Sequence, residues 1–194
     1  PRINASGRMQ NGKEAVTLLI EHNGRKAREL AEQINEYNDQ RKDLDKTMTV
    51  EANLIVENFS HQHERKAIVI YNEEWHRGII GIVASRLTEV YYKPALVLTR
   101  TDDIATGSAR SVAGFDIYKA IESCRELLDN FGGHTYAAGL SLPVQNVSKF
   151  CQRFEAYVEE HILPEQTKAT LQIDAHLSFK DISRRFHSEI RRFA

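Results

Sequence analysis

The sequence predicts an α/β fold: a mixed sheet flanked by helices, preceded by a long helix and followed by a segment of different pattern. Between residues 65 and 164, short apolar runs alternate with amphipathic stretches, which is typical of alternating strands and helices. Residues 25–64 repeat apolar side chains at helical spacings and contain no glycine or proline. The pattern changes again after Pro164, so we expect four segments: 1–24, 25–64, 65–164 and 165–194.

The first two segments are expected to be helical. Asn11 or Asn4 is placed to cap a short helix through residues 14–21. The apolar positions from Ala27 to Phe59 then predict one long amphipathic helix. Because most of its surface is polar, we expect this helix to be exposed and to connect two domains.

The third segment supplies the elements of the sheet. Strands are expected at 67–71, 95–99, 104–111 and around 139–142. Helices are expected at 79–92, 116–128 and 145–162; the first ends before a proline, and an aspartate caps the second. Strands and helices that alternate in this order predict a mixed sheet covered by helices.

The fourth segment has a different character. Residues 171–177 alternate apolar and polar side chains, as a half-buried strand does, and residues 182–193 are compatible with a helix. The sequence begins at Pro1 rather than at a methionine, so we expect it to be a piece of a longer protein.

The composition limits the classes of protein to consider. The 194 residues carry a formal net charge of −1, so any surface that binds nucleic acid must be a local one. The longest apolar run, residues 78–84, is too short to span a bilayer, and no signal peptide is visible. Cys124 and Cys151 lack the spacing of a zinc site. We therefore expect reduced thiols in a cytoplasmic protein without membrane contacts.

One stretch, GGHTYAAG at residues 132–139, is rich in glycine and alanine. Paired glycines allow a positive φ or the close approach of another group to the backbone. His134 is the side chain here that can bind an anion, ligate a metal or transfer a proton near neutral pH. We expect a tight turn that forms the floor of a phosphate-binding pocket, with the alanines in a short helical turn beneath it.

This stretch resembles the GGHxxAAG signature of the DHH-associated domain, the second domain of the DHH phosphoesterases. Three more segments are similar to the bacterial single-strand-specific DNA exonucleases of that family: PRINASGR at 1–8, WHRGIIGIVASRL at 75–87 and GSARS at 107–111. The family's version of the last segment is GSGRS, so Ala109 departs from it. The four matches occur in the family's order across most of the chain.

The resemblance implies a role for each segment. Residues 1–24 would end the metal-bearing DHH domain and 25–64 would form the connecting helix. Residues 65–164 would be the DHH-associated, substrate-binding domain, and 165–194 would begin an OB-like, oligonucleotide-binding β domain.

The resemblance also implies an activity. The intact protein would use Mn²⁺ or Mg²⁺ to degrade single-stranded DNA from the 5′ end, in DNA repair and recombination, alongside other proteins of those processes. No Asp-His-His triplet occurs in this sequence, so we expect the metal ligands in a missing DHH domain. The chain alone is then expected to be inactive or nearly so.

Site residues follow from the resemblance and from their chemistry. His134 is expected to hold the scissile phosphate without ligating a metal, and Gly132 and Gly133 to let the backbone approach it. A guanidinium flanked by hydroxyls suits a phosphate, so Arg110 is expected to bind one, together with Ser108 and Ser111. The alternative for this group is a hairpin turn with a surface arginine.

For several other residues, the sequence allows either a role in substrate binding or a structural role. His76 either contacts the substrate beside a helix start, where free N–H groups attract anions, or caps that helix. An N-terminal group either contacts DNA or braces the junction between domains: Arg2, Asn4 and Arg8. Tyr136 either stacks on a base or packs in the fold.

Three alternative functions stay open for the chain. The first is a phosphoesterase of the same family that acts on short oligonucleotides or nucleotides. The second is a single-strand-binding module without catalytic activity, and the third is a purely structural domain. The other histidines, among them His61 and His63, are isolated or point to different sides of a helix, and we expect none of them to bind metal.

Overall fold

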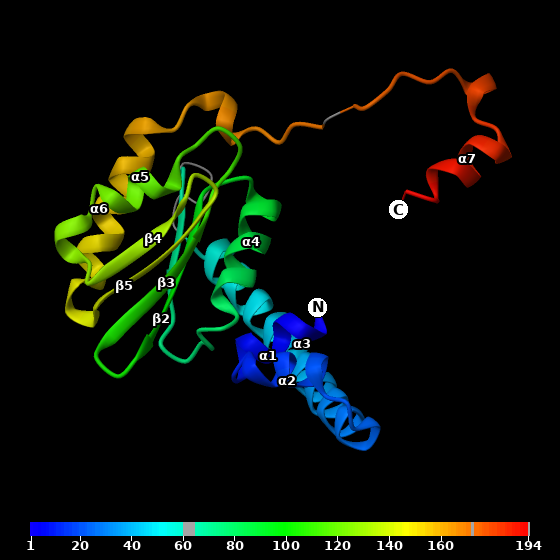
Figure 1. The fold of residues 1–194 in the computed structure, drawn as a ribbon. Coiled ribbons are helices and arrows are strands. Elements are labelled where there is room, and N and C mark those ends of the chain that lie inside the picture. The colour runs from blue at the N-terminus through cyan, green and yellow to red at the C-terminus, as the bar shows by residue number, and fades with distance from the viewer. Residues whose placement is uncertain (60–64, 172, 194) are drawn as a thin grey trace.

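The computed structural model describes residues 1–59, 65–171 and 173–193 (Figure 1). Three helices come first: α1 (Arg2–Met9), α2 (Lys13–Ile20) and α3 (Gly24–Glu57). The 34-residue α3 confirms the predicted long helix. Its N-cap is Asn23, whose side chain accepts hydrogen bonds from the backbone N–H groups of Arg25 and Lys26.

The described residues then form one mixed sheet with the strand order β1-β2-β3-β5-β4. Its strands are β1 (Ile68–Tyr71), β2 (Ala95–Thr101), β3 (Ile104–Arg110), β4 (Asn130–His134) and β5 (Ala137–Pro143). Strand β1 is parallel to β2, and the other neighbours are antiparallel. The mixed α/β architecture predicted from the sequence is thereby confirmed.

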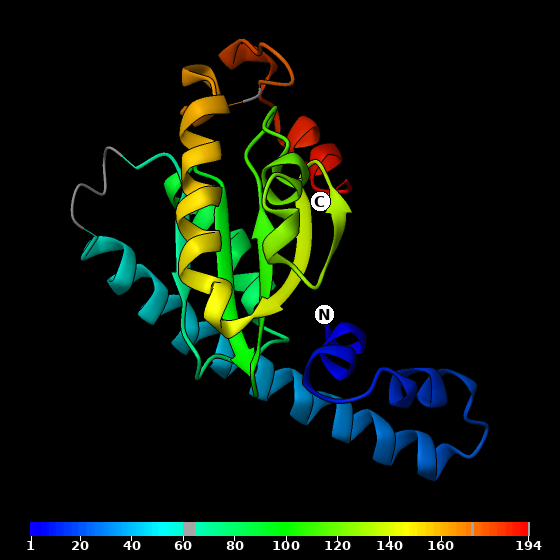
Figure 2. The ribbon, with the colours of Figure 1, turned by 90° about the vertical axis from the view of Figure 1, so that its left-hand side faces the viewer.

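Helices cover the two faces of the sheet unequally (Figure 2). On one face, α5 (Ile117–Glu122) and α6 (Val147–His161) pack on alternate residues of β2, β3 and β5, with Phe150 and Phe154 fully buried. On the other face, α4 (Ile80–Tyr91) and the C-terminal half of α3 bury Ile68 and Ile70 of β1 and Ala95 and Val97 of β2. This second core takes its strand residues from β1 and β2, so half of that face has no apolar cover from it.

The contact between α3 and α4 contains a buried carboxylate. Asp45 accepts hydrogen bonds from Nε and Nη2 of Arg86 on α4, both at 2.8 Å, and from Nη1 of Arg41 at 3.2 Å. The Asp45 side chain is 4% exposed. Arg86 thus approaches both carboxylate oxygens at once, the geometry that fixes orientation as well as distance.

Short helical turns complete the described chain: η1 (Arg125–Leu127), η2 (Val144–Asn146), η3 (Pro164–Thr167), η4 (Phe179–Asp181) and the helix α7 (Arg184–Ile190). The prediction of a helix through residue 128 is wrong, because α5 ends at Glu122 and η1 follows. The Ser123 hydroxyl there donates to the carbonyl of Ala120, a local bond that competes with continuation of the helix.

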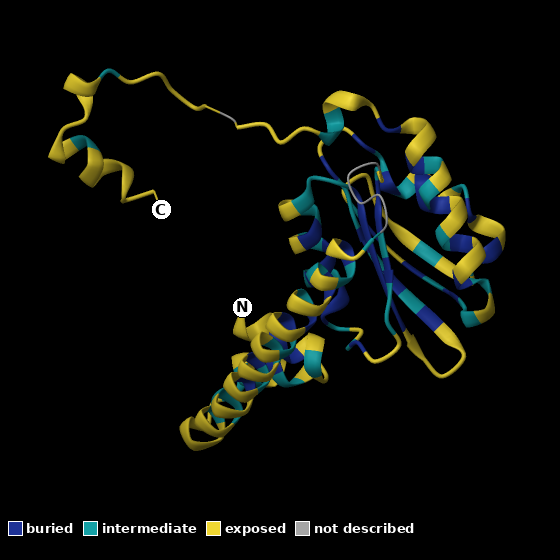
Figure 3. Ribbon diagram, turned by 180° about the vertical axis from the view of Figure 1, so that it is seen from behind, coloured by how far each residue is buried: buried dark blue, intermediate teal, exposed yellow. Residues whose placement is uncertain are grey.

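The prediction of a strand at residues 171–177 is also wrong for the part of it that the structure describes. Residue 172 lies outside the described ranges, and the others have no regular structure. Leu171 and Ile173 are 88% and 78% exposed, and the chain here extends away from the sheet (Figures 1 and 3). A strand needs a partner for its backbone groups, and no described segment supplies one here. The end of the expected connecting segment, with His61 and His63, lies outside the described residues.

In the described residues, no helix combines the length and the apolar character needed to cross a bilayer.

We predict that Asp45→Asn destabilises the chain. Removing one partner from a buried pair costs about 3–5 kcal/mol, and we expect roughly 2–3 kcal/mol because the Arg86 side chain is 48% exposed. Urea unfolding measures this loss. Asp39→Asn is the matched control, because Asp39 pairs with Lys42 on the same helix but at the surface, and it should leave the unfolding midpoint unchanged. Equal midpoints for the two variants would contradict the assignment.

Candidate phosphate-binding site

The half of the sheet face without apolar cover carries small and polar residues. In antiparallel strands, residues directly opposite one another point to the same face. The registers of β3, β5 and β4 therefore align three rows on this face: Arg110, Ala137 and His134; Ser108, Gly139 and Gly132; Thr106, Ser141 and Asn130. Four predicted site residues, Ser108, Arg110, Gly132 and His134, are thus brought onto one surface.

Arg110 is the positive centre of this surface. Its Nη1 donates to Ser108 Oγ at 3.0 Å and to the carbonyl of Ala109 at 2.8 Å. Burial lowers the pKa of the Arg110 guanidinium, and the nearby guanidinium of Arg8 lowers it further. No carboxylate acts on this pKa, so two like charges lie near each other without a counter-ion from the described residues. A bound anion would supply one.

Two glycines bring the start of α4 and α1 close to this centre. A Cβ on Gly81 would lie 3.0 Å from Ser108 Oγ and 3.1 Å from Arg110 Nη2. A Cβ on Gly78 would overlap the carbonyl oxygen of Arg8. Arg8 also donates from Nη1 to the carbonyl of Gly78 at 3.2 Å. Of the two interpretations of Arg8, the structure shows the brace, and a contact with DNA stays a prediction.

The loop before α4 is held on three sides. The buried Trp75 donates from Nε1 to Glu51 on α3 at 2.7 Å, and its carbonyl accepts from the Thr99 hydroxyl at 2.6 Å. His76 accepts through Nδ1 from the N–H of Gly78 at 3.1 Å. This bond fits the capping interpretation of His76 and occupies one of the N–H groups that an anion would use.

The glycine-rich stretch forms a β-hairpin, with β4 and β5 joined at Thr135 and Tyr136. The predicted tight turn is present at Thr135 and Tyr136, but the prediction that the alanines form a helical turn is wrong: Ala137 and Ala138 begin β5 and pair with His134 and Gly133. The reason is the pairing itself, because β5 is hydrogen-bonded on both sides, to β3 and to β4.

Of the two glycines in the hairpin, the protein's own structure requires Gly133 to be a glycine and does not require this of Gly132. Gly133 adopts φ +151°, and a Cβ there would meet the carbonyl oxygen of Ala137 and the Cα of Ala138. Gly133 is therefore required by the backbone and by packing. A Cβ on Gly132 would meet no atom within 4 Å, so packing inside the protein does not require a glycine there.

His134 lies exposed at the end of β4. Its Nδ1 accepts from the N–H of Tyr136 at 3.3 Å. A neutral imidazole that accepts through Nδ1 carries its proton on Nε2, so it offers a hydrogen-bond donor to a ligand. The Tyr136 side chain beside it is 54% exposed rather than packed in the core.

Three predicted residues are not brought to this surface. The Ser111 hydroxyl donates to the carbonyl of Phe115 at 2.7 Å, and its N–H donates to the carbonyl of Tyr136 at 3.0 Å, so Ser111 closes the loop after β3. Asn4 lines a separate hollow between α1 and α2. Arg2 acts electrostatically on Asp39 of α3.

The face also holds a groove that sequence reasoning missed. Its volume is about 360 Å³, and its lining includes the polar side chains of Arg77, Thr106, Asn130 and Ser141. In the sequence these residues are scattered over 65 positions, and only the strand register brings three of them into one row.

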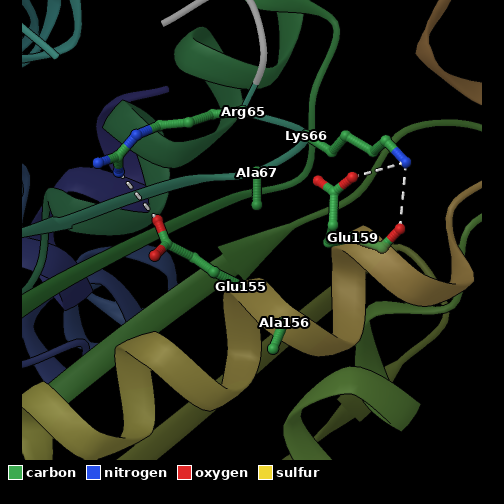
Figure 4. A pocket seen from close by; sticks show the side chains of 6 residues that line it. All are labelled: Arg65, Lys66, Ala67, Glu155, Ala156 and Glu159. Atoms are coloured by element: carbon green, nitrogen blue, oxygen red, sulfur yellow. Dashed lines mark hydrogen bonds and ion pairs between the residues drawn. The ribbon is translucent and has the colours of Figure 1, made fainter. Parts of the chain in front are cut away.

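A different hollow, between the start of β1 and α6, does not fit an anion (Figure 4). Arg65 pairs with Glu155 at 3.1 Å, and Lys66 pairs with Glu159 at 2.9 Å. Burial raises the pKa of the Glu155 carboxyl, although Arg65 opposes this shift. The cations of this hollow are therefore neutralised within the protein.

The described residues do not fit a divalent metal centre. Among them, no group of three or more histidine, cysteine, aspartate or glutamate side chains is placed to hold a metal ion. Cys124 and Cys151 are free thiols, and burial raises the pKa of Cys151 to about 12. Such a thiol stays protonated at neutral pH and is a poor ligand.

Comparisons with known proteins agree with this geometry. Residues 64–160 match the family model of the DHHA1 domain. The chain is 35% identical over 185 residues to the single-stranded-DNA-specific exonuclease RecJ of Bacillus subtilis, covering 94% of the chain and 23% of that protein. It is 34% identical to the RecJ of Escherichia coli, covering 92% of the chain and 32% of that protein.

Solved structures give the same result. RecJ of Thermus thermophilus in complex with Mg²⁺ superposes with a TM-score of 0.74 at 31% identity, over 84% of this chain and 25% of that one. A manganese-bound exonuclease RecJ also has a TM-score of 0.74, over 87% of this chain and 42% of that one. The chain thus spans only a quarter to a third of the length of the curated relatives named here.

We predict that two adjacent substitutions differ in their effect on stability. Gly133→Ala forces a side chain into a positive φ and against backbone atoms, and should cost about 2 kcal/mol or more. Gly132→Ala meets open space and should change the free energy of unfolding little. Thermal and urea unfolding of both variants measure the difference. A Gly132→Ala variant as unstable as Gly133→Ala would show that the two glycines serve the same structural purpose.

Proposed function

The chain belongs to the DHHA1 domain family, and from this premise we propose that it is the substrate-binding part of a metal-dependent 5′-to-3′ single-stranded DNA exonuclease. In this proposal the chain binds phosphates of the strand, and phosphodiester hydrolysis needs a further part of the protein. The similarity to RecJ over more than nine-tenths of the chain supports the substrate and the reaction class.

One observation carries the proposal: the half-buried guanidinium of Arg110, bonded to Ser108 and near Arg8, lies beside Gly81 of α4 and has no carboxylate partner among the described residues. Keeping two like charges close costs free energy unless an anion joins them. A phosphate fits, because it accepts from a guanidinium, from a hydroxyl and from an imidazole donor at the same time.

The roles of the site residues follow from their positions. Arg110 and Ser108 orient one phosphate, and Arg8 adds charge from α1. His134 lies in the same row as Arg110, two strands away, where it donates to the phosphate under attack and stabilises the charge that develops on it. Ala137 lies between them in that row, and Gly132 leaves the neighbouring row without a side chain. Mn²⁺ or Mg²⁺, as found in the related structures, is assigned to residues outside this chain.

The remaining parts of the proposal rest on the same relatives. Residues 1–24 end the metal-bearing domain, and 165–194 begin an OB-like domain. The exposed Leu171 and Ile173 support the second assignment, because apolar side chains at alternate positions fit a strand whose partners lie elsewhere. We also propose a cytoplasmic protein that acts in DNA repair and recombination with other proteins of those processes.

The first test measures binding of a 5′-phosphorylated single-stranded oligonucleotide by fluorescence anisotropy. Arg110→Ala should weaken binding about tenfold or more, since hydrogen bonds to charged groups are each worth about 1.5–3 kcal/mol. It should also lower the number of counter-ions released on binding by about one, seen as a shallower slope of log affinity against log salt concentration. Arg153→Ala is the control, because it removes a charge from α6, on the opposite face, where Arg153 pairs with Glu126. Equal affinities for the two variants would refute the site.

The second test asks where the metal binds. The chain with Mn²⁺ should not cleave the labelled oligonucleotide, because the described residues do not fit a metal centre. His134→Ala is assayed in parallel. Cleavage that disappears in this variant would mean that the chain holds its own metal, against the division of roles proposed here.

A further inference from the structure

We propose that the sheet face carries a second nucleotide subsite, formed by Arg77, Thr106, Asn130 and Ser141, next to the phosphate site of Arg110 and Ser108. The smallest ligand that fills both is a 5′-phosphorylated dinucleotide. This inference rests on the proposed function and specifies the ligand of the same surface.

The first argument is continuity. The groove of about 360 Å³ is lined by the four polar residues and also by Gly132 and Gly139. Those two glycines share the middle row with Ser108: Gly139 lies opposite Ser108, and Gly132 lies opposite Gly139. The phosphate site and the groove therefore share one floor.

The second argument is that the protein's own packing does not require glycines on this floor. A Cβ on Gly139 would come no closer than 3.8 Å to another atom, the carbonyl oxygen of Gly107, and a Cβ on Gly132 would meet nothing within 4 Å. Neither glycine has a positive φ. Alanine would fit the protein at both positions, so the glycines keep space for something that lies on the sheet.

The third argument is that the polar groups are unused. The described residues offer no hydrogen bond or ion pair to the side chains of Arg77, Thr106, Asn130 or Ser141. By contrast, two hydroxyls on the same face, those of Ser108 and Thr99, are bonded within the protein. Thr106 and Ser141 are nonetheless half-buried, where an unpaired hydroxyl is costly unless water or a ligand meets it.

The fourth argument is spacing. Thr106, Ser108 and Arg110 alternate along β3, so each row lies roughly 6.5 Å from the next at about 3.3 Å per residue. This is close to the separation of neighbouring phosphates in an extended single strand. One cation with two hydroxyls and an amide matches one phosphodiester and its sugar.

The experiment compares deoxynucleotides of increasing length by isothermal titration calorimetry. The ligands are a 5′-phosphorylated mononucleotide and the corresponding dinucleotide. The dinucleotide should bind about tenfold tighter, as expected for one or two added hydrogen bonds to charged groups. Arg77→Ala and Thr106→Val should remove most of that gain and leave the mononucleotide unaffected. Thr101→Val is the control, because Thr101 is an exposed residue near the β2–β3 turn, outside the groove lining.

Two results would overturn the subsite: a dinucleotide that binds no tighter than the mononucleotide, or variants that weaken both ligands equally or neither. Arg110→Ala separates this failure from that of the proposed function. If Arg110→Ala weakens the mononucleotide while Arg77→Ala and Thr106→Val have no effect, the phosphate site stands and the second subsite does not. If Arg110→Ala changes neither ligand, the proposed function fails as well.

Discussion

The carboxylate of Asp45 lies inside the contact between α3 and α4, where Arg86 and Arg41 neutralise it. Burying a charge is costly unless it is paired, and the two guanidiniums supply that pairing. The geometry of the pair fixes how α4 lies along α3. Because the loop before α4 carries Arg77 and Gly78, and α4 itself carries Gly81, the same contact fixes one wall of the phosphate site. The bond from Trp75 to Glu51 adds a second attachment to α3.

The two halves of the sheet face show what this placement does. Over β1 and β2, the apolar side chains of α4 bury Ile70 and Val97. At β3 the apolar contacts end: α4 presents Gly81 to Ser108 and Arg110, and the same face continues with serine, threonine, arginine and glycine. A sheet face that is left open must be polar or bare to remain in water. Glycine in a strand weakens it, so Gly132 and Gly139 do not serve stability, and they fit the proposed binding of a ligand on the open half.

Much of this fold could be predicted from the sequence, and the limits have physical causes. Periodicity located α3 and most elements of the sheet, because the amphipathic patterns of Ala27–Phe59 and of α6 are long and regular. The hairpin at Gly133 was missed because glycine pairs fit a tight turn and a strand pair equally well. The failed strand at 171–177 has the right alternation but no described partner. The residues Arg77, Thr106, Asn130 and Ser141 could not be found at all, since their proximity depends on strand register, which no local pattern encodes.

The phosphate site combines two segments that are far apart in the sequence, and this has a thermodynamic consequence. Arg8 belongs to α1 and Arg110 to β3, and each is positively charged near the other. The repulsion opposes the docking of α1 on Gly78, while the close approach of Arg8 to that glycine favours it. An anion bound by Arg110 lowers the electrostatic cost of keeping Arg8 in place. By linkage, anion binding favours the docking of α1 and docking favours anion binding, each by the same coupling free energy. In the proposed function, binding of the strand and docking of α1 are therefore coupled, which suits a division of roles in which this chain binds phosphates and residues outside it hold the metal.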